Sequence, residues 1–260
     1  MRTLLLSLLM SLSLSAAPDW FKDINVPKKA ALKPMPSVKL GYTMTWDGRV
    51  KAGNFDIIFG AKDPRYPKHY IVRSYGGSTG WAHVLFPYRY NYTSFLHPKT
   101  LRPIMFVGSE DDGSSVDQLS FKFTSKKVTG SEVSTELNKT KTKNKSFTYP
   151  HSLDLFSGLL QIRSMPLKQG DVVNMAFHPV ATPYLAKIKV LGREQHRGRK
   201  CIKLDVGLQK IRENLELKEY KKLKSATVWL SDDEWRVPVE INAKVFVGHV
   251  RILLSGHEAL

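Results

Sequence analysis

The stretch from His151 to Met165, HSLDLFSGLLQIRSM, decides the expected fold. At about 100° per residue, its apolar side chains fall on one helical stripe and the stripe beside it: Leu153, Phe156 and Leu160, then Leu155, Leu159 and Ile162. Polar residues take the remaining arc: Asp154, Ser157, Gln161 and Ser164. The apolar face is wider than that of a surface helix. It needs a partner surface, and the candidate is a sheet built from the flanking strands.

Both ends of this helix carry the expected signals. His151 or Ser152 can serve as the N-cap, and Asp154 suits the positive end of the helix dipole in the first turn. Arg163 suits the last turn, and Pro166 stops the helix.

Two interpretations of the apolar face stay open. The face can be buried core, or part of it can line a cavity that takes a removable ligand. Under the second interpretation, Phe156 and Leu160 are candidate ligand contacts.

The rest of the chain reads mainly as short strands. Leu40, Tyr42, Met44 and Trp46 alternate on one face, and Asp47-Gly48 is a hairpin turn signal. Similar runs precede and follow the helix. The pattern predicts a mainly β (α+β) fold, in which a curved antiparallel sheet or half-barrel wraps around one central apolar helix. Residues 208–224 fit a charged helix by composition, or a loop with a short strand.

The N-terminus predicts export. Arg2 is followed by a short apolar run and by the small residues Ser15, Ala16 and Ala17. We interpret residues 1–17 as a signal peptide, residues 18–37 as an extended leader rich in Pro and Lys, and residues 38–258 as one β-rich domain. Two half-domains joined near residue 150 stay open as an alternative. No apolar run is long enough to span a bilayer as a helix, so the expected location is the periplasm.

An aromatic row is the most informative feature for ligand binding. Phe86, Tyr88, Tyr90 and Tyr92 alternate, so a strand would place all four rings on one side. Such a row can stack on sugars or cover lipid chains. It can equally pack against the 151–165 helix as core.

The formal charge of +17 favours anionic partners. The segment 138–145 adds a basic turn with four alternating lysines, and residues 193–199 form an Arg-rich tip. We expect an anionic envelope component as partner: lipid, lipoprotein or polysaccharide. Nucleic acid fits the charge but not the compartment, and no recognition motif accompanies it.

Catalytic and metal motifs are absent from the sequence. The eight histidines are scattered, with neither HExxH nor GxSxG nor metal-ligand spacing. Cys201 is the single cysteine and lies in a strand-like run, where a buried inert thiol is expected. We therefore predict no catalytic residue, no metal and no cofactor.

Three segments together resemble the family catalogued as domain of unknown function 3108: LGYTMTWDGRVKAGNFDI (40–57), SLDLFSGLLQIRSMPLKQGD (152–171) and TVWLSDDEWRVPVEINAKVFVGHVRILL (227–254). The resemblance covers most of residues 38–256. It implies an exported β-rich protein, distantly similar to the periplasmic lipoprotein-carrier and sigma-regulator folds. It therefore implies a scaffold for a hydrophobic ligand or a lipoprotein. The family supplies no catalytic residues to carry over.

Three functions follow as hypotheses. The first is a non-enzymatic envelope protein that holds a hydrophobic or glycan ligand between sheet and helix. The second is a hydrolase of envelope material, which would need carboxylates or histidines to converge in the fold. The third is an assembly or structural protein that pairs through an exposed sheet edge.

Overall fold

The fold comes from a computed structural model that describes residues 17–28, 32–245 and 248–260. Apart from Ala17, the predicted signal peptide lies outside the described residues. The elements in chain order are η1 (Asp19–Phe21), β1 (Val38–Trp46), β2 (Val50–Ala61), β3 (Tyr70–Ser78), α1 (Trp81–Leu85), β4 (Arg89–Leu96), β5 (Pro103–Asp111), β6 (Ser115–Phe123), β7 (Lys127–Glu136), β8 (Lys139–Thr148), α2 (Leu155–Ile162), β9 (Val172–Phe177), β10 (Tyr184–His196), β11 (Arg199–Ile211), β12 (Leu217–Glu219), β13 (Leu223–Ser231), β14 (Pro238–Val245) and β15 (His249–Ala259).

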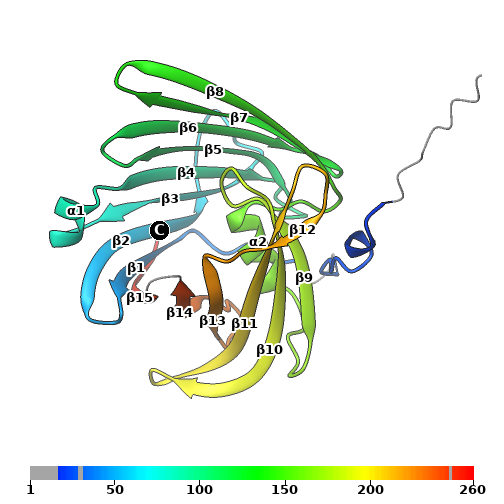
Figure 1. The fold of residues 1–260 in the computed structure, drawn as a ribbon. Helices are drawn as coiled ribbons and strands as arrows, with labels where there is room; N and C mark the ends of the chain where they lie inside the picture. The colour runs from blue at the N-terminus through cyan, green and yellow to red at the C-terminus, as the bar shows by residue number, and fades with distance from the viewer. Residues whose placement is uncertain (1–16, 29–31, 246–247) are drawn as a thin grey trace, which may run out of the picture.

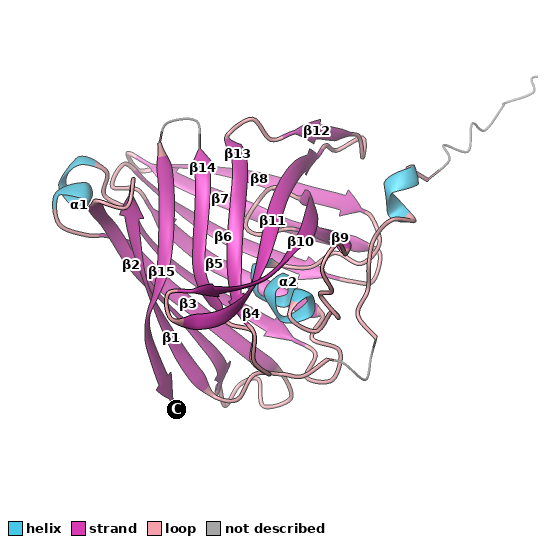
Figure 2. Cartoon of the chain, turned by 90° about the horizontal axis from the view of Figure 1, so that it is seen from below, coloured by secondary structure: helices cyan, strands magenta, loops and turns pink. Residues whose placement is uncertain are grey.

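One antiparallel sheet contains all fifteen strands of the described chain. Its order runs from edge strand β8 through β7 to β1, then through β15, β14, β13, β11 and β10 to edge strand β9. The sheet curves into an unclosed barrel, and α2 lies inside it (Figure 1). Figure 2 shows the same helix against the concave face. The predicted fold class, a curved antiparallel sheet wrapped around one apolar helix, is confirmed.

The helix is shorter than the sequence predicts. It begins after Asp154, whose carboxylate accepts the Ser157 N–H at 2.7 Å, while the Ser157 hydroxyl accepts the Asp154 N–H at 2.8 Å. His151 has a left-handed φ of 55°, and Leu153 forms a β-bridge with Phe177. The predicted caps, His151 and Ser152, are therefore wrong. A reciprocal capping box satisfies two backbone N–H groups at once, so it fixes the start at Asp154.

The polar residues within α2, and its N-cap, are buried. Ser157 and Gln161 have almost no exposed surface, and Asp154 has none. The Ser94 hydroxyl on β4 donates to the Asp154 carboxylate, so the polar arc is tied to the sheet. Burial raises the pKa of Asp154 above its ordinary value.

The other end of α2 is held by Arg163. Its guanidinium is buried and donates to three backbone carbonyls: Trp235 at 2.6 Å, Lys33 at 3.0 Å and Glu234 at 3.5 Å. Arg163 is the C-cap and not a residue of the last turn. These bonds join the helix end to the β13–β14 loop and to the segment before β1.

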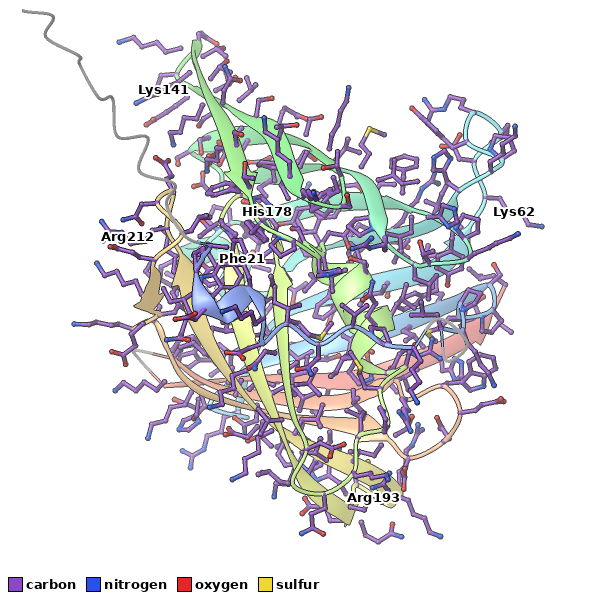
Figure 3. All side chains as sticks on the ribbon, turned by 90° about the vertical axis from the view of Figure 1, so that its right-hand side faces the viewer. Phe21, Lys62, Lys141, His178, Arg193 and Arg212 are labelled. Atoms are coloured by element: carbon purple, nitrogen blue, oxygen red, sulfur yellow. The ribbon has the colours of Figure 1, made fainter. Side chains whose placement is uncertain are left out.

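The seam between edge strands β8 and β9 is filled by side chains. His178 lies against the rings of Phe121 and Phe147, with centroids 4.6 and 5.6 Å away. Lys145 on β8 donates to the Ala181 carbonyl at 3.1 Å. Trp20 is buried, and its indole N–H donates to the Leu215 carbonyl at 3.0 Å. Figure 3 shows His178 among interior side chains, whereas Lys141 and Arg212 lie at the periphery.

Two segments take a form that the sequence left open or misjudged. Residues 208–224 are strand, turn and the short strand β12, so the loop interpretation is confirmed and the helical one is wrong. The basic segment 138–145 is not a turn: only Leu137 and Asn138 turn, and the lysines belong to edge strand β8. Lysines on an edge strand oppose pairing with another chain.

Replacing Asp154 by Ala should lower the free energy of unfolding by about 2–4 kcal/mol, because a cap is lost and buried donors lose their acceptor. Asp154→Asn keeps an acceptor oxygen and should cost about 1 kcal/mol. Urea unfolding followed by tryptophan fluorescence measures both. Equal losses in the two variants would contradict the capping role.

His178 should make stability depend on pH. Burial, together with the nearby Lys145, lowers the pKa of His178 to about 3. Because the unfolded state binds this proton below about pH 6.5, stability is full above that pH. It should then fall towards pH 3 by up to about 1.4 kcal/mol per pH unit.

The His178→Phe variant should lose this slope, and a matched change at exposed His257, His257→Gln, should keep it. Thermal unfolding across this pH range measures the difference. An unchanged slope in His178→Phe would show that other groups cause the acid sensitivity.

Candidate functional site

The helix α2 separates two apolar clusters. Phe156 and Leu160 belong to the larger one, which extends over β1 to β8 and includes Tyr92 and Phe106. Ile162 belongs to the smaller one, formed with the side chains of β9, β10, β11 and β13. Leu159 packs against both clusters. The helix therefore joins the two halves of the sheet from inside.

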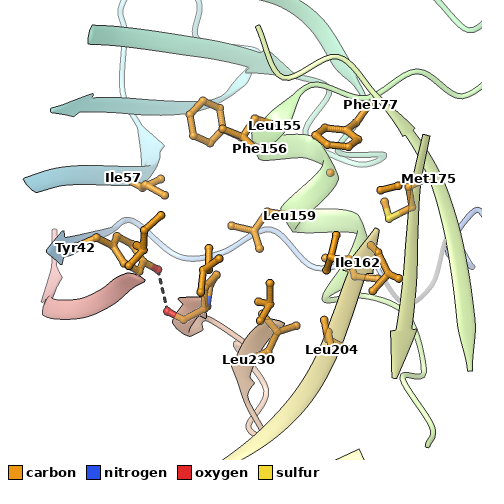
Figure 4. A pocket seen from close by; sticks show the side chains of 18 of the residues that line it. Tyr42, Ile57, Leu155, Phe156, Leu159, Ile162, Met175, Phe177, Leu204 and Leu230 are labelled. Atoms are coloured by element: carbon orange, nitrogen blue, oxygen red, sulfur yellow. Dashed lines mark hydrogen bonds between the residues drawn. The ribbon is translucent and has the colours of Figure 1, made fainter. Parts of the chain in front are cut away.

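A cavity of about 350 Å³ remains between α2 and the sheet (Figure 4). It is lined by aliphatic and aromatic side chains and by Gly158 of the helix: Tyr42, Phe55, Ile57, Leu155, Phe156, Leu159, Ile162, Met175, Phe177, Ala186, Ile188, Leu204, Val206, Val228, Leu230, Pro238, Ile241 and Ile252. Among the described residues, no Asp, Glu, His, Lys or Arg lines it. Its one side-chain hydroxyl, on Tyr42, donates to the Pro238 carbonyl at 3.1 Å and is thereby satisfied.

The helix presents different faces to the core and to the cavity. Leu155, Leu159 and Ile162 lie one helical turn apart and line the cavity. Leu160 is completely buried in the larger cluster and is not part of the lining. Phe156 belongs to the cluster and also reaches the cavity. Of the two helix residues predicted as ligand contacts, the structure therefore places only Phe156 at the cavity.

Gly158 is the unusual residue of this face. It sits in the middle of an eight-residue helix, where glycine costs about 1 kcal/mol relative to alanine. A Cβ placed there would meet no atom within 4 Å. Close packing therefore does not require glycine at this position. The missing side chain instead leaves room in the cavity.

Only three of the four rings of the predicted aromatic row lie next to one another. Phe86 ends α1 and is 75% exposed, so the predicted four-ring strand face is wrong for Phe86. Tyr88, Tyr90 and Tyr92 do follow one another, with ring centroids 6.1 and 4.5 Å apart. None of these four residues lines the cavity. A ligand role for the row stays a prediction.

Hydrogen bonds tie down the tyrosines of the row. The Tyr92 hydroxyl donates to the Glu110 carboxylate, and the Tyr90 hydroxyl lies 3.0 Å from the Ser74 hydroxyl. Burial raises the pKa of Tyr90 to about 12 and that of Tyr92 further. Both phenols are thus neutral at pH 7. Tyr92 belongs to the same core cluster as Phe156, which agrees with the packing interpretation.

Titratable groups converge on the opposite face of the sheet. Glu240 on β14 is buried, accepts two bonds from Arg251 at 2.6 and 3.0 Å, and lies 2.9 Å from the His196 ring nitrogen. His196 stacks on Trp229 at 4.2 Å. Burial alone would raise the pKa of Glu240, but the bonds from Arg251 and His196 lower it below its ordinary value. Every hydrogen-bonding group of this carboxylate is engaged, so the cluster is an ion-pair network rather than a poised acid or base.

The described part of the chain meets neither the requirements of a metal site nor those of a membrane-spanning helix. No group of three or more His, Cys, Asp or Glu side chains there has the arrangement to hold a metal ion. Within the same residues, helices that could cross a bilayer are absent. Cys201 is buried, and burial raises the pKa of its thiol, as expected for an inert cysteine.

Most of the lining was beyond sequence reasoning. The strand residues of the cavity come from β1, β2, β9, β10, β11, β13, β14 and β15. Their alternation predicts that they face inward, but only strand pairing brings Tyr42, Leu204 and Ile252 to one place. The usable signals in the sequence were the wide apolar face of the helix, which pointed to Phe156, and Gly158 in the middle of that helix.

The structural comparisons concern the fold alone. A β-barrel-like protein of domain of unknown function DUF1849 from Brucella abortus aligns with a TM-score of 0.55 and 7% identity, over 88% of this chain and 99% of that chain. A putative exported protein with a YmcC-like fold from Bacteroides fragilis has a TM-score of 0.34 and 11% identity, over 87% and 98% of the two chains. The lipoprotein LppX of Mycobacterium tuberculosis has a TM-score of 0.23 and 12% identity, over 87% and 88%.

Only the first of these likenesses is close enough to support the architecture. No curated protein matches the sequence. The family model described as "Protein of unknown function (DUF3108)" matches residues 41–255, which is most of the chain and runs from within β1, through α2, into β15. The chain therefore belongs to the DUF3108 family.

Proposed function

We propose that this protein is a non-enzymatic holder of a hydrophobic ligand, with an acyl chain as the simplest occupant. The observation that carries the proposal is the cavity between α2 and the sheet, lined by apolar side chains around the free space at Gly158. Its volume of about 350 Å³ lies within the usual range for ligand pockets, about 300–1,000 Å³.

The chemistry of the lining selects the ligand class. A sugar or a charged group would lose its hydrogen bonds to water in this cavity, and the one hydroxyl of the lining, on Tyr42, already donates to the Pro238 carbonyl. A hydrocarbon chain would lose none and would gain contacts that the cavity walls now lack. The cavity therefore favours the lipid form of the ligand over the glycan form.

The alternative functions receive less support. A hydrolase needs a titratable group beside the substrate, and the Glu240 cluster lies on the face opposite the cavity with its partners saturated. An assembly protein needs a free sheet edge. Edge strand β8 carries alternating lysines, and edge strand β9 is bridged by Ile24 and Leu153.

The protein would act in the periplasm, on an anionic envelope component. The predicted signal peptide would deliver the chain to the periplasm, where acyl chains are held by membranes and lipoproteins. The formal charge of +17 suits an anionic envelope component carrying that chain. Residues contributing to the site are then Phe156, Leu155, Leu159 and the strand residues that face them.

Gly158→Ala should raise the free energy of unfolding by about 0.5–1 kcal/mol, because alanine is the better helix former and its Cβ meets open space. Urea unfolding of the delipidated protein measures this change. A loss of stability would mean that the space beside Gly158 is not open.

Gly158→Phe should fill the cavity and abolish ligand uptake while the fold is kept. The probe is dansylated undecanoic acid, whose fluorescence rises on entering an apolar site. Native mass spectrometry of protein purified from the secreted fraction then reports any ligand acquired in the cell. Gly158→Ala is the matched control and should bind within about twofold of the unmodified chain.

The proposal fails if the unmodified chain neither takes up the probe nor carries an extractable lipid. It also fails if Gly158→Phe, with an unchanged circular dichroism spectrum, binds the probe as tightly as Gly158→Ala.

A further inference from the structure

One end of the barrel carries a row of exposed apolar side chains. The hairpins β1–β2, β3–β4, β5–β6 and β7–β8 all turn at this end, because neighbouring strands are antiparallel. We call their turns the rim. Figure 1 shows α1 and these four turns together at the left.

The apolar side chains gather on the α1 segment. Trp81 is 81% exposed, Phe86 is 75% exposed, and Val84 and Leu85 are each 69% exposed. Leu137, at the tip of the β7–β8 turn, is 87% exposed. Trp46 and Val50 add to the row from the β1–β2 turn. Apolar residues so concentrated at the surface mark a contact site with another molecule or with a membrane.

The α1 segment is held rigidly in this exposed position. The Ser78 hydroxyl accepts the Tyr88 N–H at 3.0 Å and lies 3.0 Å from Nδ1 of His83. Gly77 allows the two strands to approach closely, since a Cβ there would lie 2.2 Å from the Tyr88 carbonyl oxygen. The inner side of the segment is thus pinned, and Trp81 and Phe86 project away from the body.

Basic side chains surround the apolar row. Eight exposed lysines and arginines lie at or next to the rim and form no ion pair within the described part of the chain: Arg49, Lys51, Arg89, Lys139, Lys141, Lys221, Lys222 and Lys244. The acidic residues there are Asp47, Asp111, Asp112, Glu136 and Glu219. Asp47 and Asp112 accept backbone N–H groups of nearby turns. Exposed aromatic residues ringed by cations match the interface of an anionic bilayer.

On β1, β11, β13, β14 and β15 the concave face stays apolar from the cavity to the rim. The inward positions between the lining residues and the turns are Met44, Val250, Ala243, Leu208 and Ala226; Ala226 is buried and the other four are half-buried. A chain leaving the cavity on this side would therefore pass along apolar side chains. The rim is the end where such a chain would meet a membrane.

We propose that the rim docks on the surface of an anionic lipid bilayer, with Trp81, Phe86 and Leu137 entering the interfacial region and the surrounding lysines and arginines meeting the headgroups. This inference deepens the proposed function, since it names the surface from which the held acyl chain would come. The docking itself does not require an intact cavity, so the two can fail separately.

Vesicle flotation tests the docking. Protein from the secreted fraction should float with phosphatidylcholine vesicles that contain phosphatidylglycerol, and much less with phosphatidylcholine alone. The double variant Trp81→Ser, Phe86→Ser should lower the affinity for these vesicles about tenfold or more, because it removes the two aromatic side chains that would be buried in the bilayer interface. Ile104→Ser with Leu191→Ser, which removes two exposed apolar residues elsewhere, should float like the unmodified chain.

Charge is tested in the same way. Lys139→Gln with Lys141→Gln should weaken binding to the anionic vesicles severalfold, whereas Lys187→Gln with Lys189→Gln, on exposed positions of β10, should not. Gly158→Phe should still float, which separates this inference from the cavity proposal. The docking is refuted if the unmodified chain does not bind either vesicle. It is also refuted if Trp81→Ser, Phe86→Ser binds the anionic vesicles normally. A third refuting outcome is that this double change leaves vesicle binding unchanged and converts a dimer into a monomer in size-exclusion chromatography, since the exposed side chains would then form a contact between two copies of the chain.

Discussion

A single short helix cannot cover the concave face of so long a sheet, and this constraint shapes the rest of the molecule. The helix α2 has eight residues, whereas the sheet around it runs from β8 to β9 without closing. Side chains from the seam complete the interior on one side, among them Trp20, Phe147 and His178. On the other side the helix packs against two clusters and leaves unfilled space between them. Aromatic and aliphatic side chains line that space without filling it, and Gly158 leaves it open on the side of the helix.

The curved antiparallel sheet could be predicted from the sequence because strand and turn signals are local. Alternation along Leu40, Tyr42 and Met44 and the Asp47-Gly48 turn depend on a few neighbouring residues, and both turn residues have the positive φ that such hairpins need. The start of the helix was harder to predict, because Leu153 fits the helical period but forms a β-bridge with Phe177 on β9. Periodicity places Ser157 and Gln161 on the polar arc of the helix but does not tell whether that arc is exposed. Only tertiary contacts, with Ser94 beneath Asp154, show that the polar arc is buried.

The candidate site was less accessible to sequence reasoning for the same physical reason. A cavity is defined by what is missing between elements, and sequence patterns report what is present. The alternating aromatic residues predicted a ligand-binding row. In the structure, however, the Tyr92 hydroxyl donates to Glu110 and the Tyr92 ring is packed in the core. Phe86 lies outside the strand altogether, since Gly80, with a left-handed φ of 58°, lets the chain enter α1 instead of continuing the hairpin. The exposed aromatic residues of α1 look like core residues in the sequence, because hydrophobicity alone does not reveal exposure.

The way α2 is fastened bears on how a ligand could enter. Its N-cap, Asp154, is tied to β4 through Ser94, and its C-cap, Arg163, is tied to the β13–β14 loop. Removing either polar contact would leave a buried group without its partner, so both ends resist displacement. The middle of the helix, at Gly158 and Leu159, faces the cavity and lacks packing on that side. Under the proposed function, a hydrocarbon chain would therefore occupy the space without moving the helix. This arrangement suits a holder whose site is formed before the ligand arrives, because little conformational entropy is lost on binding.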